Sequence, residues 1–453
     1  MKGSWGYIAA LMVGVTLGSF AYQPFVAVPA AQAQILSPEQ KAKLQAEYDQ
    51  LQKEIATWQK VLDDTRAKKK TLTGDVTALD AQIKKAQKEI QQRTISITTL
   101  GSEIIQKTAA ITTLEQKLAA GKESLAKLMR EKNEMETIPL ALLALSADSL
   151  SGFFADVQSI DTINQDLQDR FAELRGVKAE TQKEKEALDA RKAAELDARY
   201  EVQQKQNQIK ENQQEKQQLL AVTKKDEQSY QAVLSERQKR AQEIRNALFE
   251  LRDSAGISFA SAMQYATEAQ QSTGVRAAFI LGILRQESNL GTNVGQCLLT
   301  DPGTGAGKGK NSGTPINKVM KPDRDVQPFL DLMSRLGADP YNTPVSCPQS
   351  VGYGGAMGPS QFIASTWKLY EKRITAAAGV SVADPWSPKQ AVMATALFLR
   401  DLGASKQTYS AEREAAGRYY AGANWKRSGL SYAASVLSFA EKYQKDIDFL
   451  KEN

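Results

Sequence analysis

The feature that most constrains the fold of this chain is the spacing of apolar residues between positions 44 and 128. They recur at alternating steps of four and three, pause in a polar stretch at Thr65 and Lys69, and resume in the same register at Leu72. A period of 3.5 residues kept over about twelve heptads is typical of a coiled coil. At a rise of 1.5 Å per residue, we expect one helical arm roughly 130 Å long.

A second heptad stretch runs from near Ile160 to near Leu251. Its seam is richer in Gln and Lys, but its last part keeps apolar residues in register. These residues are Tyr230, Leu234, Ala241, Ile244, Leu248 and Leu251. Because the two arms have nearly equal lengths, the simplest fold is an antiparallel hairpin within one chain. A parallel homodimer of single rods is the competing geometry, and the heptads alone allow both.

The segment between the arms, residues 138–160, is unusually apolar for a connection. Pro139 ends the first arm, and the segment is too short to cross a bilayer. An apolar patch at the far end of a thin rod indicates a contact site for a partner. The alternative is a small helical knot that buries its own side chains, and both descriptions can hold together. The side chains concerned are Leu140, Leu143, Leu150, Phe153 and Phe154.

The N-terminus has the pattern of an export signal. Lys2 is the only charged residue before Glu39, and an apolar run follows it. Small residues then lead to an A-x-A cleavage pattern at residues 31–33. We therefore expect a signal peptide at residues 1–33 and an extracytoplasmic protein. An uncleaved anchor is the alternative, although the run is short for a spanning helix, which needs about 20 apolar residues.

The composition removes several classes of chemistry. The chain has no histidine and two cysteines among its 453 residues. A Ser-His-Asp triad, a Cys-His pair and the common zinc sites are therefore excluded, and we expect neither a metal nor a cofactor. The net charge of +6 is spread along the chain, which suits work near anionic polymers and gives no argument for nucleic acid. In an oxidising compartment we expect Cys297 and Cys347 to form a disulfide, with two free thiols as the alternative.

Residues 256–453 have the pattern of a compact, mostly helical domain. Ser387 stands at a helix N-cap and Pro388 at the first helical position, and Gly403 follows the last turn. Residues 292–325 have the composition of a long flexible loop rich in Gly, Pro and Lys. Its "GTGAGKGKNSG" lacks the spacing of a phosphate-binding loop. Other helices are expected at 259–272, 275–288, 326–336, 359–374, 410–420 and 429–450.

The coil, with "ADSLSGFF" at its turn, resembles the coiled-coil domains of division-associated cell-wall hydrolase regulators of the PcsB, EnvC and CwlO type. The resemblance covers residues 39–252. It implies a partner, because in that family the coil docks onto an FtsEX-type ABC transporter. Those proteins usually end in a zinc endopeptidase-like or a Cys/His domain. The absence of histidine excludes both here, so the C-terminal region must carry different chemistry.

Three segments of the C-terminal region form a set: "RQESNLG" (285–291), "GYGGAMGPSQFIASTW" (352–367) and "GRYYAGANW" (417–425). In this order, and in a helical exported domain, they resemble the lytic transglycosylases of the lysozyme-like superfamily, in particular the membrane-bound lytic transglycosylase B type. The resemblance implies a bacterial enzyme of the periplasm or cell wall. Its expected substrate is the MurNAc–GlcNAc bond in the glycan strands of peptidoglycan.

The resemblance assigns roles position by position. Glu287 matches the catalytic Glu of an E-S-x-x-G motif, Ser288 matches its partner hydroxyl, and Gly291 matches the closing glycine. Tyr419 falls where the family places a tyrosine near the scissile bond. Tyr420 stands where the family has asparagine, so we expect a substitute to contact the substrate there.

The remaining assigned positions lie close to this set. Asn424 is the candidate to replace the missing asparagine, and Gln361 matches the residue that faces the sugar groove. Met357 is expected at the groove, where it could also give Glu287 an apolar setting. A close turn against the catalytic helix is expected from Gly355, Ala356, Met357 and Gly358.

One carboxylate is enough for this chemistry. A glycosidase normally uses two, but the other acids considered, Asp301, Asp323 and Asp325, fall in the expected loop. In a lytic transglycosylase the 6-hydroxyl of muramic acid attacks and closes a 1,6-anhydro ring. One Glu protonates the leaving oxygen and then accepts the proton of that hydroxyl. Such a Glu must hold its proton near neutral pH, which requires an apolar setting that raises its pKa.

We therefore predict an all-α protein in which a long antiparallel coiled-coil hairpin, residues 34–255, precedes a lysozyme-like catalytic domain, residues 256–453. Two other functions fit the same residues. A non-catalytic scaffold or activator would bind peptidoglycan without cutting it. A muramidase would use water as the nucleophile. Anhydro ends, reducing ends or no products distinguish the three.

Overall fold

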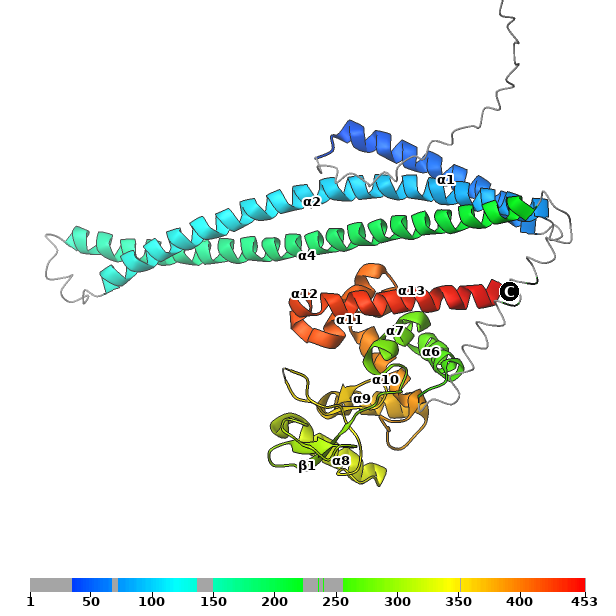
Figure 1. The fold of residues 1–453 in the computed structure, drawn as a ribbon. Coiled ribbons are helices and arrows are strands. Elements are labelled where there is room, and N and C mark those ends of the chain that lie inside the picture. Colours follow the sequence, from blue (N-terminus) through cyan, green and yellow to red (C-terminus); the bar gives the residue numbers. More distant parts are fainter. Residues whose placement is uncertain are drawn as a thin grey trace, which may run out of the picture.

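The computed structural model describes residues 35–66, 72–136, 150–222, 256–350 and 352–452, and the single positions 235 and 239. Three long helices come first: α1 (Pro38–Arg66), α2 (Leu72–Glu136) and α4 (Leu150–Val222). A region of shorter helices and small sheets follows, and its helices α11 (Tyr409–Ala421) and α13 (Leu430–Glu452) both contact α4 (Figure 1). The predicted all-α class is confirmed.

α2 and α4 lie side by side in opposite directions (Figure 1). Ion pairs give their register, because Lys107 pairs with Glu184 at 2.8 Å, and Arg93, earlier in α2, pairs with Glu201, later in α4. Exposed pairs of this kind contribute little stability, typically about 0–1 kcal/mol each. Apolar seam residues are buried between the helices, including Ile97, Ala198 and Val202. The hairpin predicted within one chain is confirmed, and association into a homodimer stays a prediction.

The prediction of a single continuous first arm is wrong. α1 ends at Arg66 and packs back along α2 in the opposite direction. The N–H of Leu36 donates to the hydroxyl of Ser102 at 2.7 Å, and Lys85 donates to Gln59 at 2.6 Å. The 65 residues of α2 span roughly 100 Å, which is shorter than the expected arm.

The reason lies in what a heptad pattern reports. It reports which face of a helix is apolar, and a reversal of the chain between two helices leaves that pattern intact on both sides. The polar lapse at Thr65 and Lys69 was the signal of the interruption. Because α1 runs antiparallel to α2, the apolar faces of the two helices cover each other. Leu51, Leu62 and Leu79 are buried.

Most C-terminal helices agree closely with the expected ranges, but the helix expected at 359–374 begins only at Ala364, because residues 362–363 form a strand. The helices are α6 (Phe259–Thr273), α7 (Ala277–Ser288), α8 (Gln327–Leu336), α9 (Ala364–Ala378), α10 (Pro388–Asp401), α11 (Tyr409–Ala421), α12 (Trp425–Ser428) and α13, with short turns η2 (Pro322–Val326), η3 (Ala404–Lys406) and η4 (Gly422–Asn424). Local chemistry sets their ends. The Ser258 hydroxyl accepts from the N–H of Ser261 at the start of α6, and left-handed residues, Gly274 and Asn289, follow α6 and α7.

α7 occupies the centre of this region and packs against α13, α6 and α10. Its residues from Ala277 to Leu284 are all buried, so the helix is apolar around most of its circumference. Gly282 allows α13 to approach, because a Cβ at this position would lie 2.7 Å from the carbonyl oxygen of Val436. The central position of α7 fixes its last turn against the surrounding elements.

The prediction of a flexible loop at residues 292–325 is wrong. This segment contains a three-stranded antiparallel sheet, β1 (Cys297–Asp301), β2 (Ala306–Gly309) and β3 (Pro315–Ile316), in the order β1-β2-β3. Gly307 shows why glycine stands here, because a Cβ would lie 2.0 Å from the carbonyl oxygen of Leu298. Glycines that indicated flexibility therefore permit close strand pairing. A second small sheet pairs β4 (Ala356–Met357) with β5 (Phe362–Ile363).

Several sequence predictions lie outside the described residues. These are the signal peptide at 1–33, most of the apolar turn at 138–160 and the end of the second arm near 251. α4 begins at Leu150, which is earlier than the arm was expected to start. Within the described ranges, none of the helices is both long and apolar enough to cross a membrane.

Candidate active site

Glu287 lies in the last turn of α7, where the buried helix reaches the surface. Its side chain is half-buried, while the neighbouring residues Arg285 and Gln286 are exposed. The turn that follows is unusual, because Asn289 and Leu290 both have positive φ values, 52° and 55°. This sharp ending stops the helix one residue after the carboxylate and leaves Glu287 at the edge of the core.

Tyr432, near the start of α13, contacts this carboxylate directly. Its hydroxyl donates a hydrogen bond to Oε1 of Glu287. The ring of Tyr432 stacks on that of Tyr420, with centroids 5.0 Å apart and planes 14° from parallel. Tyr432 is not predictable from the three quoted segments, because it lies outside them and has the spacing of an ordinary amphipathic helix. Only the crossing of α7 and α13 brings it to Glu287.

The surroundings raise the pKa of Glu287 from 4.5 to about 7. The principal cause is desolvation by burial, which disfavours the charged carboxylate. The hydrogen bond from Tyr432 acts in the opposite direction, because it stabilises the ionised form. Burial prevails, so a large share of the carboxyl groups is protonated near neutral pH. An acid with this pKa can give up and recover a proton at physiological pH.

Tyr419 lies beside Glu287 without a hydrogen bond to it. The charge of Glu287 contributes to raising the pKa of Tyr419, after the larger effect of burial. Its hydroxyl donates to the carbonyl oxygen of Ser360 at 2.6 Å, and its ring meets that of Phe362 edge-on at 5.9 Å. The structure therefore brings together two of the sequence-predicted residues, Glu287 and Tyr419, and adds Tyr432.

Ser288 connects α7 to the glycine-rich turn. It is 1% exposed, and its hydroxyl donates to the carbonyl oxygen of Pro359 at 2.6 Å and accepts from the N–H of Gly291 at 2.8 Å. These contacts fix the end of α7 against residues 356–361. The part of Ser288 in substrate binding stays a prediction.

The glycine-rich turn at residues 355–358 has a backbone that favours glycine and comes close to Pro385, and its role as a close turn against α7 stays a prediction. Gly355 and Gly358 have positive φ values, 92° and 62°. A Cβ at Gly358 would lie 1.9 Å from the carbonyl oxygen of Pro385, so only glycine fits. Ala356 pairs with Ile363 across β4 and β5, and Met357 is buried.

Two other predicted substrate contacts stay predictions. Gln361 has a positive φ of 52° and donates to the carbonyl oxygen of Gly358 at 2.8 Å. Asn424 is exposed in η4, and its backbone oxygen accepts from Ser428 at 3.3 Å. Among the described residues, neither side chain forms a hydrogen bond with Glu287 or with the tyrosines beside it.

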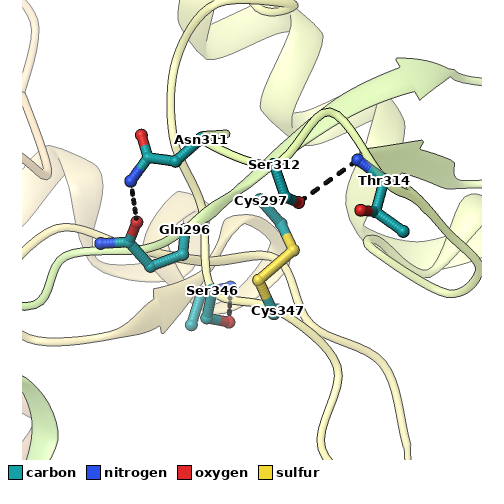
Figure 2. The surroundings of a disulfide bond; sticks show 8 residues. Gln296, Cys297, Asn311, Ser312, Thr314, Ser346 and Cys347 are labelled. Atoms are coloured by element: carbon teal, nitrogen blue, oxygen red, sulfur yellow. Dashed lines mark hydrogen bonds between the residues drawn. A yellow bond between two sulfur atoms is a disulfide. The ribbon is translucent and has the colours of Figure 1, made fainter. Parts of the chain in front are cut away.

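The predicted disulfide is confirmed. Cys297 and Cys347 are bonded with an S–S distance of 2.06 Å, 50 residues apart. Figure 2 shows the bridge between β1 and the segment that precedes the glycine-rich turn. The adjacent Ser346 donates its N–H to the oxygen of Ala356 at 2.8 Å, and its hydroxyl accepts from the N–H of Ala356 at 2.9 Å. The bridge thus anchors the sheet to the motif beside Glu287.

The three other acids considered are engaged elsewhere. Asp325 is fully buried and accepts from the N–H and hydroxyl of Ser365 at the start of α9. Asp301 accepts from the hydroxyl of Thr304 at 2.6 Å, while Asp323 is ion-paired within its own turn. None of these three carboxylates is hydrogen-bonded to Glu287.

Comparison with known proteins gives two solved structures. One is the Escherichia coli lytic transglycosylase Slt35 in complex with bulgecin A, with 14% identity and a TM-score of 0.28. The other is a 36 kDa muramidase/transglycosylase, with 15% identity and the same TM-score. Each alignment covers 49% of this chain and 88% of the other. No protein-family model and no curated protein matches the chain.

Proposed function

We propose that this protein is a lytic transglycosylase that cleaves the MurNAc–GlcNAc bond of peptidoglycan, with Glu287 as its single acid and base. The observation that carries the proposal is the setting of Glu287: a half-buried carboxyl whose pKa is raised to about 7 and whose Oε1 accepts a hydrogen bond from Tyr432. The three matching motifs of the sequence support the same activity.

The hydrogen bond supports an assignment of the two carboxyl oxygens. Because Oε1 accepts from Tyr432, the acidic proton of Glu287 belongs on Oε2. In the first step Oε2–H protonates the glycosidic oxygen, and the bond from that oxygen to C1 of MurNAc breaks. In the second step the carboxylate takes the proton of the 6-hydroxyl of MurNAc, whose oxygen attacks C1. The products are a 1,6-anhydro end and a free GlcNAc hydroxyl, and Glu287 regains its proton.

The engagement of the other candidate acids supports this reaction over hydrolysis. A classical retaining enzyme places two carboxyl groups about 5 Å apart, and an inverting one about 6.5–9.5 Å apart. Asp301, Asp323 and Asp325, the other candidates, make contacts of their own. An internal hydroxyl nucleophile requires no such partner.

The test is mass spectrometry of purified murein after digestion. The proposal expects 1,6-anhydromuramic ends from the wild-type protein, and a loss of at least about 10²-fold in rate for Glu287→Gln, which cannot donate the proton. Reducing ends would identify a hydrolysing muramidase. Binding to murein without products would identify a scaffold, and wild-type turnover by Glu287→Gln would refute the mechanism.

We also propose that the hairpin tethers or regulates the enzyme outside the cytoplasm after export by residues 1–33. The partner proposed for the apolar turn at 138–160 is an FtsEX-type ABC transporter. The length of α2, roughly 100 Å, supports a remote contact site. Aspartate substitutions at Leu150, Phe153 and Phe154 should abolish binding to an extracellular loop of that transporter. Unchanged affinity in a helical triple variant would place the contact elsewhere, or show that there is none.

A further inference from the structure

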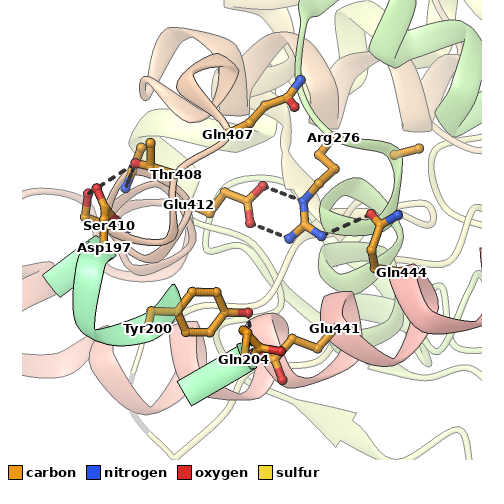
Figure 3. A network of polar contacts seen from close by, with 12 residues as sticks. Asp197, Tyr200, Gln204, Arg276, Gln407, Thr408, Ser410, Glu412, Glu441 and Gln444 are labelled. Atoms are coloured by element: carbon orange, nitrogen blue, oxygen red, sulfur yellow. Dashed lines mark hydrogen bonds and ion pairs between the residues drawn. The ribbon is translucent and has the colours of Figure 1, made fainter. Parts of the chain in front are cut away.

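The long helix α4 contacts the C-terminal region through Asp197, Tyr200 and Gln204 (Figure 3). Further along α4, Glu211 pairs with Lys445 of α13 at 2.6 Å. Asp197 binds the start of α11, where Oδ1 accepts from the N–H of Ser410 at 2.6 Å and Oδ2 accepts from its hydroxyl at 2.8 Å. The first N–H groups of a helix have no partner within it, and a negative charge is favourable there. Thr408 caps another of these groups, on Ala411. A side chain of α4 thus completes the N-terminus of α11.

Tyr200, one turn further along α4, lies between α11 and α13. Its ring stacks on that of Tyr409 in α11, with centroids 4.1 Å apart and planes 16° from parallel. Its hydroxyl donates to Oε1 of Glu441 in α13 at 2.6 Å, and Gln204 also donates to that oxygen at 3.3 Å. A single tyrosine therefore binds two helices of the C-terminal region at once.

A buried ion pair joins the same helices beneath this contact. Arg276, at the N-cap of α7, makes two hydrogen bonds to Glu412 of α11, at 3.0 and 2.7 Å, and one to Gln444 of α13 at 3.2 Å. Glu412 is 2% exposed. Paired charges that are buried require every partner in place, and losing one is costly. The charges of both Arg276 and Glu412 act on Tyr200, so this network and the contact from α4 are adjacent.

The three helices joined here are those that form the candidate active site. α7 carries Glu287, α11 carries Tyr419 and α13 carries Tyr432. Arg276 and Glu287 stand at opposite ends of α7, which has 12 residues and is roughly 18 Å long. The contact from α4 therefore lies behind the site and does not cover the carboxylate.

We propose that Asp197 and Tyr200 are positioning residues: by docking on α11 and α13, α4 fixes the spacing of the helices that place Tyr419 and Tyr432 around Glu287. The inference rests on the proposed function, because turnover of murein is one of its measurements. It assigns the hairpin a role in holding the active geometry. A hairpin that covers the glycan groove would have the opposite effect on activity.

The first experiment compares full-length variants on murein fragments. Tyr200→Ala and Asp197→Ala should lower kcat about tenfold with little change in KM, because a small displacement of catalytic groups affects the chemical step. Tyr200→Phe keeps the stacked ring and should lose less. Arg199→Ala is the matched control, since Arg199 pairs with Glu195 on α4 itself. Amide hydrogen exchange in residues 409–421 should accelerate in Tyr200→Ala and stay unchanged in Arg199→Ala.

The second experiment is a rescue. In the Asp197→Cys/Ser410→Cys double variant, reduction should lower kcat as in Asp197→Ala, and oxidation to a disulfide should restore it. Wild-type protein taken through the same steps controls for the Cys297–Cys347 bridge. Higher turnover in the reduced form, or loss on oxidation, would mean that α4 covers the groove and would overturn the proposal.

Two other outcomes would also overturn it. Variants that lose thermal stability but keep the wild-type kcat would give the contact a structural role only. Unchanged exchange in α11 after Tyr200→Ala would show that α4 does not hold that helix. If wild-type protein cleaves no murein, the proposed function fails by itself, and the exchange measurement, which needs no substrate, still decides whether α4 braces the catalytic helices.

Discussion

At the scale of single residues, two opposing effects set the pKa of Glu287: burial and one hydrogen bond. Burial disfavours the carboxylate, and the hydroxyl of Tyr432 favours it. The resulting pKa of about 7 lies well above the ordinary 4.5. When a carboxyl whose pKa is raised in the folded state ionises, the free energy of unfolding falls. The protein is therefore less stable at a pH at which Glu287 is ionised.

The first prediction follows from that loss of stability. Between pH 4.5 and about 7 the folded state keeps a proton that the unfolded state has lost. The free energy of unfolding therefore falls as the pH rises through this window, by roughly 3 kcal/mol in total. Glu287→Gln does not ionise and should escape the loss. Its thermal midpoint relative to wild type should thus rise by several degrees between pH 4.5 and pH 8; a constant difference would contradict the raised pKa.

Removing the opposing hydrogen bond gives the second prediction. Tyr432→Phe should raise the pKa of Glu287 further, because the bond stabilises the carboxylate. The high-pH limb of the activity profile should move to higher pH by about one unit. A hydrogen bond to a charged group contributes about 1.5–3 kcal/mol, and water replaces part of that stabilisation. Tyr420→Phe, which keeps the stacked ring, is the control and should leave the limb in place. A downward shift for Tyr432→Phe would refute the assignment.

At the scale of elements, the glycine-rich turn depends on two backbone segments that almost touch. The φ of Gly358 is +62°, and its Cα faces the carbonyl oxygen of Pro385. Gly379, at the end of α9, has a similar φ of +68° but open space where a Cβ would be. The two positions therefore separate the effect of dihedral strain from that of a steric clash.

The third prediction uses this pair. Gly379→Ala should lower the free energy of unfolding by about 1–2 kcal/mol, which is the strain of a left-handed alanine. Gly358→Ala should cost more than about 3 kcal/mol, because backbone must also move, and it should reduce activity, since the turn binds Ser288 through Pro359. Denaturant unfolding of both variants measures the difference. Equal losses would show that the clash is relieved cheaply.

The small sheet β1-β2-β3 and its disulfide form a second unit at this scale. Cys297 is linked to the segment 345–347 by backbone hydrogen bonds with Val345, at 3.0 and 2.9 Å, as well as by the bridge. The covalent link and the backbone pairing therefore act on the same strand. Loss of the bridge should loosen the sheet before it affects α7.

The fourth prediction is the size and place of that effect. Replacing Cys297 and Cys347 together by Ser should lower the free energy of unfolding by up to about 4 kcal/mol for a loop of this length. Hydrogen exchange should rise in residues 297–316 and much less in 277–288. Native, unreduced protein should show no thiol that reacts with an alkylating reagent. Two reactive thiols in that protein would contradict the bridge.

At the scale of the whole molecule, the hairpin is held by an apolar seam and by ion pairs between α2 and α4. Lys107 contacts Glu184, and Lys185 contacts Glu115 at 2.7 Å. Arg93, earlier in α2, pairs with Glu201, later in α4, so the pairs together define an antiparallel register. A parallel dimer would place different residues opposite each other.

The fifth prediction tests this register in solution. A zero-length carbodiimide reagent should join Lys107 to Glu184 and Lys185 to Glu115 within the band of monomeric protein. Mass spectrometry of the digested band identifies the linked peptides. Arg191 and Glu103, which also pair, provide a control, because arginine does not react. Links found only in a dimeric band would favour association between chains.

The sequence by itself determined the features that depend on local pattern. The 3.5-residue period specified long helices with one apolar face, because helix periodicity alone fixes which residues share a stripe. Glycine and capping residues specified the ends of the C-terminal helices, and the quoted motifs specified Glu287, Tyr419 and the turn at 355–358. The spacing of Cys297 and Cys347 allowed their pairing.

Only the tertiary structure decided which stripes and strands meet. The reversal between α1 and α2, and the contacts of Tyr432 with Glu287 and of Tyr200 with α11 and α13, join residues distant in sequence. An amphipathic helix buries its stripe against any complementary surface, so its pattern does not name the partner. The pKa of Glu287 depends on those partners, because burial is a property of the packed molecule.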